Sequence, residues 1–150
     1  MLCRRAISSD LAALARLYVF LNPADPVLSP DDPAVLDLWD TILADHRLRY
    51  FVAEIDGLVV GTCAFTLIPN LTRGMRPYAV IENVVTDPSF RQRGFGTALL
   101  QHALAEAWSE GCYKVMLSTG SKRESTLHFY EQAGFQRGIK TGFVAYPPKA

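Results

Sequence analysis

Apolar residues stand in several short, nearly continuous runs, and runs of this length are typical of buried or half-buried strands. Asp56 and Gly57 separate two of them, and this dipeptide between apolar runs is a strong signal for a β-hairpin. The first part of the chain is therefore expected to contain an antiparallel strand pair. The predicted strands cover residues 2–7, 50–55, 58–68, 78–86, 113–118 and 135–146.

Other apolar residues return every three or four positions, which is the spacing of one helix face. Ser8-Ser9-Asp10 offers an N-cap to the first of these segments, and Gly111 and Gly134 each follow the last apolar residue of a later one. Loops rich in proline or glycine occupy residues 22–33 and 69–77. The predicted helices cover residues 11–18, 35–43, 96–108 and 124–133.

The order of these elements predicts an α/β fold with a mixed sheet. Antiparallel strands come first, and a strand, helix, strand, helix unit follows, which requires a right-handed parallel crossover. Helices are expected to cover the sheet, and in such sheets ligands bind at the carboxyl ends of strands. We expect residues 1–150 to form a single domain, because the chain is 49% hydrophobic and long enough to bury a core.

Charge and cysteine content exclude several classes of protein. Lysine plus arginine and aspartate plus glutamate both number 15, so no global charge attracts the chain to nucleic acid or to a membrane surface. Cys3, Cys63 and Cys112 are odd in number and widely spaced, which argues against a disulfide framework and favours a reducing cytoplasm. The three histidines lack the spacing of metal ligands, so no metal is predicted. No apolar run reaches the length of a membrane span, and nothing resembles a signal peptide.

A glycine-spaced turn leads from a predicted strand directly into a long predicted helix. The first N–H groups of a helix have no partner within it, and the helix dipole adds partial positive charge there, so the turn predicts an anion site. A P-loop would need a Gly-Lys-Ser/Thr ending, and a dinucleotide fingerprint would need a small residue at Leu99. Taken alone, the turn is also compatible with a tight strand-to-helix connection in which the glycines satisfy only backbone geometry. It consists of Arg91, Gln92, Arg93, Gly94, Phe95, Gly96 and Thr97.

Two blocks of sequence resemble the GNAT superfamily of N-acetyltransferases, which use acetyl-coenzyme A. Residues 84–96 are similar to the superfamily's strand, bulge and pyrophosphate turn. Residues 128–135, His-Phe-Tyr-Glu-Gln-Ala-Gly-Phe, are similar to its Phe-Tyr-Glu-x-x-Gly-Phe block. Both blocks occur in the family's order, separated by one helix and one strand, and this combination is more specific than either block alone.

The resemblance implies which residues bind the coenzyme. The backbone of residues 91–97 would bind the pyrophosphate, and the strand containing Val84 and Val85 would pair with the pantetheine arm through its backbone. Phe129 belongs to the same coenzyme site. Tyr130 would lie near the sulfur and protonate the departing thiolate, although a core aromatic residue would also fit its position.

Transfer of an acetyl group to an amine also requires a base, because a primary amine is protonated at neutral pH. Glu82 is the preferred candidate, since a carboxylate within an apolar strand is costly unless it is paired or functional. A structural ion pair with an arginine, or a role in orienting the substrate, is the alternative. A backbone N–H freed at the bulge would stabilise the oxygen that gains negative charge.

The predicted activity is direct transfer of an acetyl group from acetyl-CoA to a primary amine, without an acyl-enzyme intermediate. The acceptor stays open among small amines, amino sugars, amino acids and peptides. Its pocket is expected between the loops 22–33 and 70–77, where Arg73 and Arg76 would favour an acidic acceptor. A non-catalytic module that binds acyl-CoA is the alternative function. Relatives often dimerise through closing strands like residues 138–146, which makes a homodimer an option.

Overall fold

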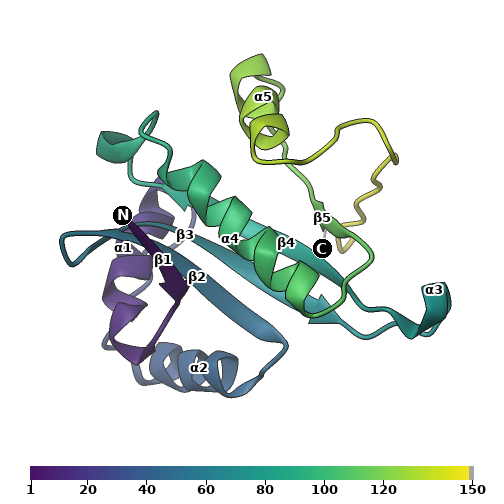
Figure 1. Ribbon diagram of the computed structural model, residues 1–150. Coiled ribbons are helices and arrows are strands. Elements are labelled where there is room, and N and C mark those ends of the chain that lie inside the picture. Colours follow the sequence, from purple (N-terminus) through teal and green to yellow (C-terminus); the bar gives the residue numbers. More distant parts are fainter. Residues whose placement is uncertain (149–150) are drawn as a thin grey trace.

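The computed structural model describes residues 1–148 and contains a five-stranded sheet in the order β1-β2-β3-β4-β5 (Figure 1). The neighbouring pairs from β1 to β4 are antiparallel, and β4 pairs with β5 in parallel. The predicted mixed sheet is therefore confirmed. Its strands are β1 (Leu2–Arg5), β2 (Leu48–Ile55), β3 (Leu58–Ile68), β4 (Tyr78–Thr86) and β5 (Val115–Leu117).

Helices lie on both faces of this sheet. Helix α4 packs on one face, and α1 and α2 pack on the other, as the ribbon shows (Figure 1). Helix α5 follows β5 at the open end of the sheet, and α3 is a single turn before β4. The helices are α1 (Leu11–Leu21), α2 (Pro33–Ala44), α3 (Thr72–Met75), α4 (Phe95–Ser109) and α5 (Glu124–Gln132), with 3₁₀ turns at η1 (Ser8–Asp10) and η2 (Pro88–Phe90).

Alternation along the central strands divides the core into two layers. Phe51 on β2 packs in the cluster under α4, whereas its neighbour Val52 packs in the cluster under α1 and α2. Successive side chains of a strand point to opposite faces, so near-continuous apolar runs are what a sheet covered on both faces requires. Both residues are almost fully buried.

The hairpin between β2 and β3 has the geometry that its sequence predicts. Asp56 has φ 49° and Gly57 has φ 78°, so both central residues lie in the left-handed region. A two-residue turn with two positive φ angles matches the right-handed twist of the flanking strands. This turn aligns β2 with β3 over almost their whole length.

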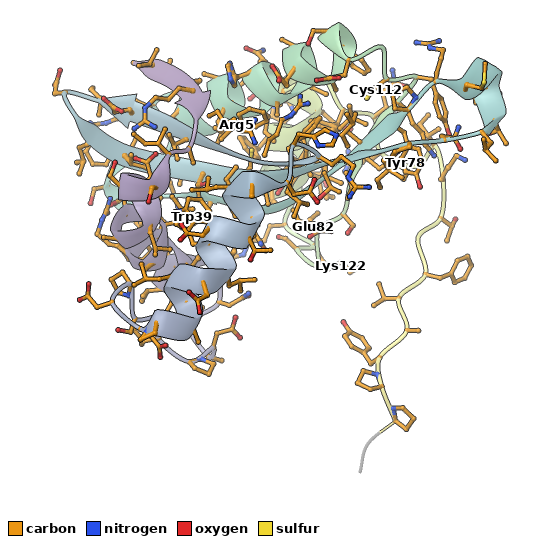
Figure 2. The ribbon with its side chains drawn as sticks, turned by 90° about the horizontal axis from the view of Figure 1, so that it is seen from below. Arg5, Trp39, Tyr78, Glu82, Cys112 and Lys122 are labelled. Carbon is orange, nitrogen blue, oxygen red and sulfur yellow. The ribbon has the colours of Figure 1, made fainter. Side chains whose placement is uncertain are left out.

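Two strand predictions need correction. The segment 113–118 contributes only the three half-buried residues of β5. The segment 135–146 forms no strand, and its residues from 136 onward are exposed and extend away from the sheet (Figure 2). Its apolar residues favour an extended backbone, but a strand needs a neighbouring edge for its hydrogen bonds, and this segment has none within residues 1–148. The exposed apolar side chains include Ile139, Phe143, Val144 and Tyr146.

Candidate active site

The parallel pairing of β4 with β5 ends halfway along β4. Ala79–Ile81 pair with Val115–Leu117, and β4 then continues to Thr86 without a neighbour on that side. The backbone groups of residues 82–86 therefore border an open wedge between the two strands. An unpaired strand edge of this kind can hydrogen-bond an extended ligand as another strand would.

A bulge lies at the beginning of this wedge. The register between β3 and β4 shifts between Thr62 and Ala64, and Asn83 has φ 53°. Ile81 before the bulge packs under α4, whereas Val85 after it packs under α1. The extra residue therefore reverses which side chains face each layer, as expected for a β-bulge. Val84 packs partly against the α4 layer, so the predicted pair Val84 and Val85 faces both layers.

The glycine turn presents a row of free backbone donors. The N–H groups of residues 92–97 make no hydrogen bond within residues 1–148, and the first bond of α4 runs from Ala98 to the carbonyl of Gly94. Six consecutive free N–H groups at the start of a 15-residue helix are suited to binding an anion. The predicted anion site is therefore supported by the geometry of the turn.

The two glycines of the turn are needed for different reasons. Gly94 has φ 84°, a conformation that side chains disfavour. Gly96 does not have a positive φ. A Cβ there would lie 3.0 Å from the ring of Phe129 and 3.2 Å from the hydroxyl of Thr86. Phe129 thus packs directly on the first turn of α4, which joins the two blocks of sequence that resemble the GNAT superfamily.

Most other side chains of the turn are occupied within the protein. Phe95 is buried and packs edge-on against Phe90, so only its backbone faces the wedge. Arg91 donates a hydrogen bond from Nε to the carbonyl of Thr86 at 3.1 Å. The guanidinium of Arg93 lies 5.4 Å from the centre of the Phe90 ring. Gln92 is exposed and has φ 59°.

Tyr130 lies between two aromatic rings, with centroids 4.9 Å from Phe129 and 6.5 Å from Phe135. Burial raises the pKa of its phenol, and the charges of Glu82 and Cys63 raise that pKa further. A raised pKa keeps the phenol protonated at neutral pH, which a proton donor requires. The fold therefore places Tyr130 of α5 where the charge of Glu82 on β4 acts on its phenol.

Glu82 differs from its prediction in one respect, because its side chain is exposed rather than enclosed in an apolar strand (labelled in Figure 2). It pairs with no arginine or lysine in the described part of the chain, so the alternative of a structural ion pair is not supported. The carboxylate is therefore free to accept a proton from a molecule that enters from solvent.

The cysteines are unsuited to nucleophilic catalysis. Cys63 lies on β3 at the bulge and is fully buried, and burial raises the pKa of its thiol to about 12. Burial also raises the pKa of Cys3 and of Cys112. A thiol with a raised pKa stays protonated at neutral pH and is a poor nucleophile. These values favour direct transfer.

A cavity of about 200 Å³ lies on the other side of the bulge, against α1. Its walls come from Ala15, Tyr18 and Val19 on α1, from most residues between Leu21 and Leu28, and from Asn83 of the bulge. The hydroxyl of Tyr18 is buried and has no hydrogen-bond partner within residues 1–148. Sequence reasoning placed the loop 22–33 at such a pocket, but it missed Tyr18 and Asn83, because neither stands in a recognisable motif.

The loop 70–77 does not contribute to this cavity. Arg76 donates hydrogen bonds to the carbonyls of Gly111 and Cys112, and Arg73 stacks on Tyr113. At about 3.3 Å per residue along β4, Arg76 lies roughly 20 Å from Asn83. Figure 1 shows α3 and α1 at opposite ends of the sheet. Arg73 and Arg76 therefore do not line this cavity, and their predicted place beside the acceptor site stays a prediction.

Comparison with known proteins places this architecture in a family. The family described as "Acetyltransferase (GNAT) family" matches residues 14–135. The chain belongs to this family. The predicted acetyltransferase activity is thus confirmed at the level of the family, and the match includes both the glycine turn and the block around Tyr130.

Individual relatives agree with this assignment. Glucosamine 6-phosphate N-acetyltransferase of Trypanosoma brucei brucei is 34% identical over 128 residues, which cover 85% of this chain and 84% of the relative. The solved structure of a protein from Agrobacterium tumefaciens str. C58 is 42% identical, with a TM-score of 0.92 and coverage of 98% of this chain and all of that one. Aminoglycoside N-acetyltransferase AAC(6′)-Iy, solved in complex with CoA, is 24% identical with a TM-score of 0.75, covers 98% and 93% of the two chains, and shows the shared fold alone.

Neither a metal-binding cluster nor a membrane-spanning helix occurs within residues 1–148. Residues 1–148 contain no group of three histidine, cysteine, aspartate or glutamate side chains arranged to hold a metal ion. None of their helices is both long enough and apolar enough to cross a membrane.

Proposed function

We propose that this protein transfers an acetyl group from acetyl-CoA directly to a primary amine. The main support for the proposal is the row of N–H groups of residues 92–97, which make no hydrogen bond within residues 1–148 and lie beside the unpaired edge of β4. This arrangement offers one site for a pyrophosphate and a continuous edge for an extended arm. CoA contains both groups, and a GNAT relative has been solved with CoA bound.

The residues around the wedge have separate tasks in this proposal. The backbone of residues 91–97 binds the pyrophosphate, and the backbone of Val84 and Val85 holds the pantetheine arm. Phe129 supports this site through its contact with Gly96. Acetyl-CoA supplies an activated acetyl group, and the protein orients the thioester between β4 and α5.

Two side chains move protons. Glu82, exposed at the bulge, accepts the proton of the incoming ammonium directly or through water, which makes the amine nucleophilic. Tyr130, whose raised pKa keeps it protonated, donates a proton to the departing thiolate. A backbone N–H at the bulge stabilises the oxygen that becomes negative during transfer.

The test is to incubate the protein with acetyl-CoA and a panel of amines, and to measure the free CoA thiol together with acetyl-CoA binding by calorimetry. We expect binding and amine-dependent release. Binding without release for any amine would favour the alternative, a module that binds acyl-CoA without turnover. Absence of binding would contradict both functions.

The role of Glu82 is tested separately by the variant Glu82→Gln. If Glu82 is the base, the acidic limb of the kcat/KM profile belongs to its carboxyl group and disappears in the variant, with a rate loss of roughly 100-fold. Asp56→Asn, at the exposed hairpin turn, is a matched control. A full rate with an unchanged acidic limb would remove Glu82 from the mechanism.

We further propose that a single domain spanning residues 1–150 carries this activity in the cytoplasm, and that it acts as a homodimer. The three cysteines are free, which suits a reducing compartment. The exposed apolar segment 139–146 and the short edge strand β5 are each suited to pairing with a second copy. Sedimentation should show a dimer that dissociates when residues 138–150 are removed, and a monomeric full-length chain would contradict this.

A further inference from the structure

We infer that the acceptor is a small amine that carries a second positive charge and no phosphate, such as a diamine, a polyamine or a polyamino sugar. The inference rests on the proposed function and concerns the cavity between α1 and the bulge at Asn83. It assigns a substrate class to that cavity from its position, its charge and its size.

The position of the cavity makes it the acceptor side of the site. Asn83 lines it and is the neighbour of Glu82, the proposed base. The proposed coenzyme site lies along the edge of β4 from which β5 has separated, whereas the cavity lies on the face of the sheet that α1 covers. An amine in the cavity would therefore reach the thioester at the bulge, from the side opposite the pantetheine arm.

The walls of the cavity carry negative charge only. Asp25 is its one ionisable acid, and it includes no lysine, arginine or histidine. Arg16, the nearest cation in sequence on α1, is directed elsewhere, because its guanidinium donates to Asp87 Oδ2 at 2.6 Å and to the carbonyl of Val59 at 2.6 Å. No cationic side chain in this cavity is therefore available for the charge-assisted hydrogen bonds that hold a phosphate group most strongly.

The loop that forms the cavity wall and the helix that follows it add further negative charge. Residues 22–45 contain six aspartates and no lysine or arginine. Asp25, Asp31, Asp37 and Asp40 form no salt bridge within residues 1–148. A local excess of one sign of charge raises the concentration of the opposite ion, even though the whole chain has a formal net charge of zero.

The cavity also offers neutral polar groups and limits the size of the acceptor. Asn22 and Asn83 line it together with Tyr18, whose buried hydroxyl lacks a partner within the described chain. Such a hydroxyl is expected to hydrogen-bond a ligand or an ordered water. The cavity has a volume of about 200 Å³. This is somewhat more than the volume of about 150 Å³ of a cavity that holds one benzene ring. One sugar ring or a short alkyl diamine fits this space, whereas a peptide would have to extend out of it.

Two pairs of acceptors, whose members differ by one ammonium group or by one phosphate group, test the inference. CoA release at saturating acetyl-CoA gives kcat/KM for 1-aminobutane against 1,4-diaminobutane, and for glucosamine against glucosamine 6-phosphate. We expect the second ammonium to raise kcat/KM about fivefold at low salt and the phosphate to lower it by a similar factor. The difference in kcat/KM between the diamine and the monoamine should become smaller as added salt screens the attraction of the second ammonium to the cavity.

The variant Asp25→Asn should bring the ratio between diamine and monoamine close to one, and Asp56→Asn should leave that ratio as in the wild type. Calorimetric binding of 1,4-diaminobutane should weaken in parallel for Asp25→Asn only. An equal or reversed order within either pair, with CoA still released, would overturn the inference and leave the proposed acetyl transfer intact. Binding of acetyl-CoA without release for any amine would instead overturn the proposed function, and the inference with it.

Discussion

On one side of β4 the proposed coenzyme site consists of backbone N–H groups and an open strand edge, and on the other side the cavity consists of loop side chains. The proposed coenzyme site needs a defined φ at Gly94 and a close contact at Gly96. The cavity needs only a suitable set of side chains around Asn83. Recognition through the backbone restricts residue types at fixed spacing and so leaves a motif, whereas recognition through a loop leaves only a bias in composition.

The largest change in rate is expected at Tyr130, where the proposed coenzyme site and the cavity side of β4 meet. Tyr130→Phe removes the proton donor, so kcat should fall roughly 100-fold, while calorimetric binding of acetyl-CoA stays near that of the wild type. Tyr146→Phe, at an exposed position of the closing segment, serves as the matched control. An unchanged kcat would mean that Tyr130 is only a core aromatic and that the donor side requires no acid.

The next largest effect is on stability and acetyl-CoA binding, and it concerns the proposed coenzyme site alone. Gly96→Ala forces a Cβ against Phe129, and such overpacking costs about 1–3 kcal/mol. The melting temperature should fall, and acetyl-CoA should bind roughly tenfold more weakly, because the turn that carries the free N–H groups is displaced.

A second substitution and a control separate this contact from a general effect of the new methyl group. Adding Phe129→Leu to Gly96→Ala should restore part of the lost affinity for acetyl-CoA. Gly120→Ala should change nothing, since a Cβ there meets open space. Full affinity in the Gly96→Ala variant would mean that the turn does not depend on this contact.

The smallest effect is on stability, and it concerns the ion pair that joins α1 to the segment before the glycine turn. Arg16 on α1, the helix that lines the cavity, pairs with Asp87, which precedes the glycine turn. Because Arg16 is half-buried, Arg16→Met should cost about 1 kcal/mol in the free energy of unfolding. Arg47→Met, which breaks a more exposed pair with Asp45, should cost less.

The same link has a defined pH dependence. The hydrogen bond from the Ser89 N–H lowers the pKa of Asp87, and Arg16 lowers it further. A lowered folded-state pKa contributes stability above the unfolded value of about 3.9, and this contribution is lost as the pH falls through the folded value. Denaturant unfolding below pH 5 should therefore show a smaller loss of stability for Arg16→Met than for the wild type. Equal losses would show that Arg16 does not act on Asp87.

Local sequence was a good guide wherever the physical cause was local. The helices, the Asp56-Gly57 hairpin and the bounds of β4 follow from periodicity and turn chemistry. The closing segment was the main error, because its apolar residues favour an extended backbone whether or not a partner strand exists. The arginines of the loop 70–77 look like anion ligands from sequence alone, and only the structure shows that Arg76 donates to carbonyls of the turn after α4.

The sequence by itself determined the order of the elements and the donor turn, because helix periodicity, capping and glycine conformations act over a few neighbouring residues. Only the tertiary structure decided that β5 leaves β4 after Ile81, that the bulge at Asn83 reverses the faces of the strand, and that Tyr130 approaches Glu82. It also decided that the acidic loop, and not Arg73 or Arg76, lines the cavity. These features depend on residues far apart in the chain, and their contacts form only when the sheet and both helix layers pack together.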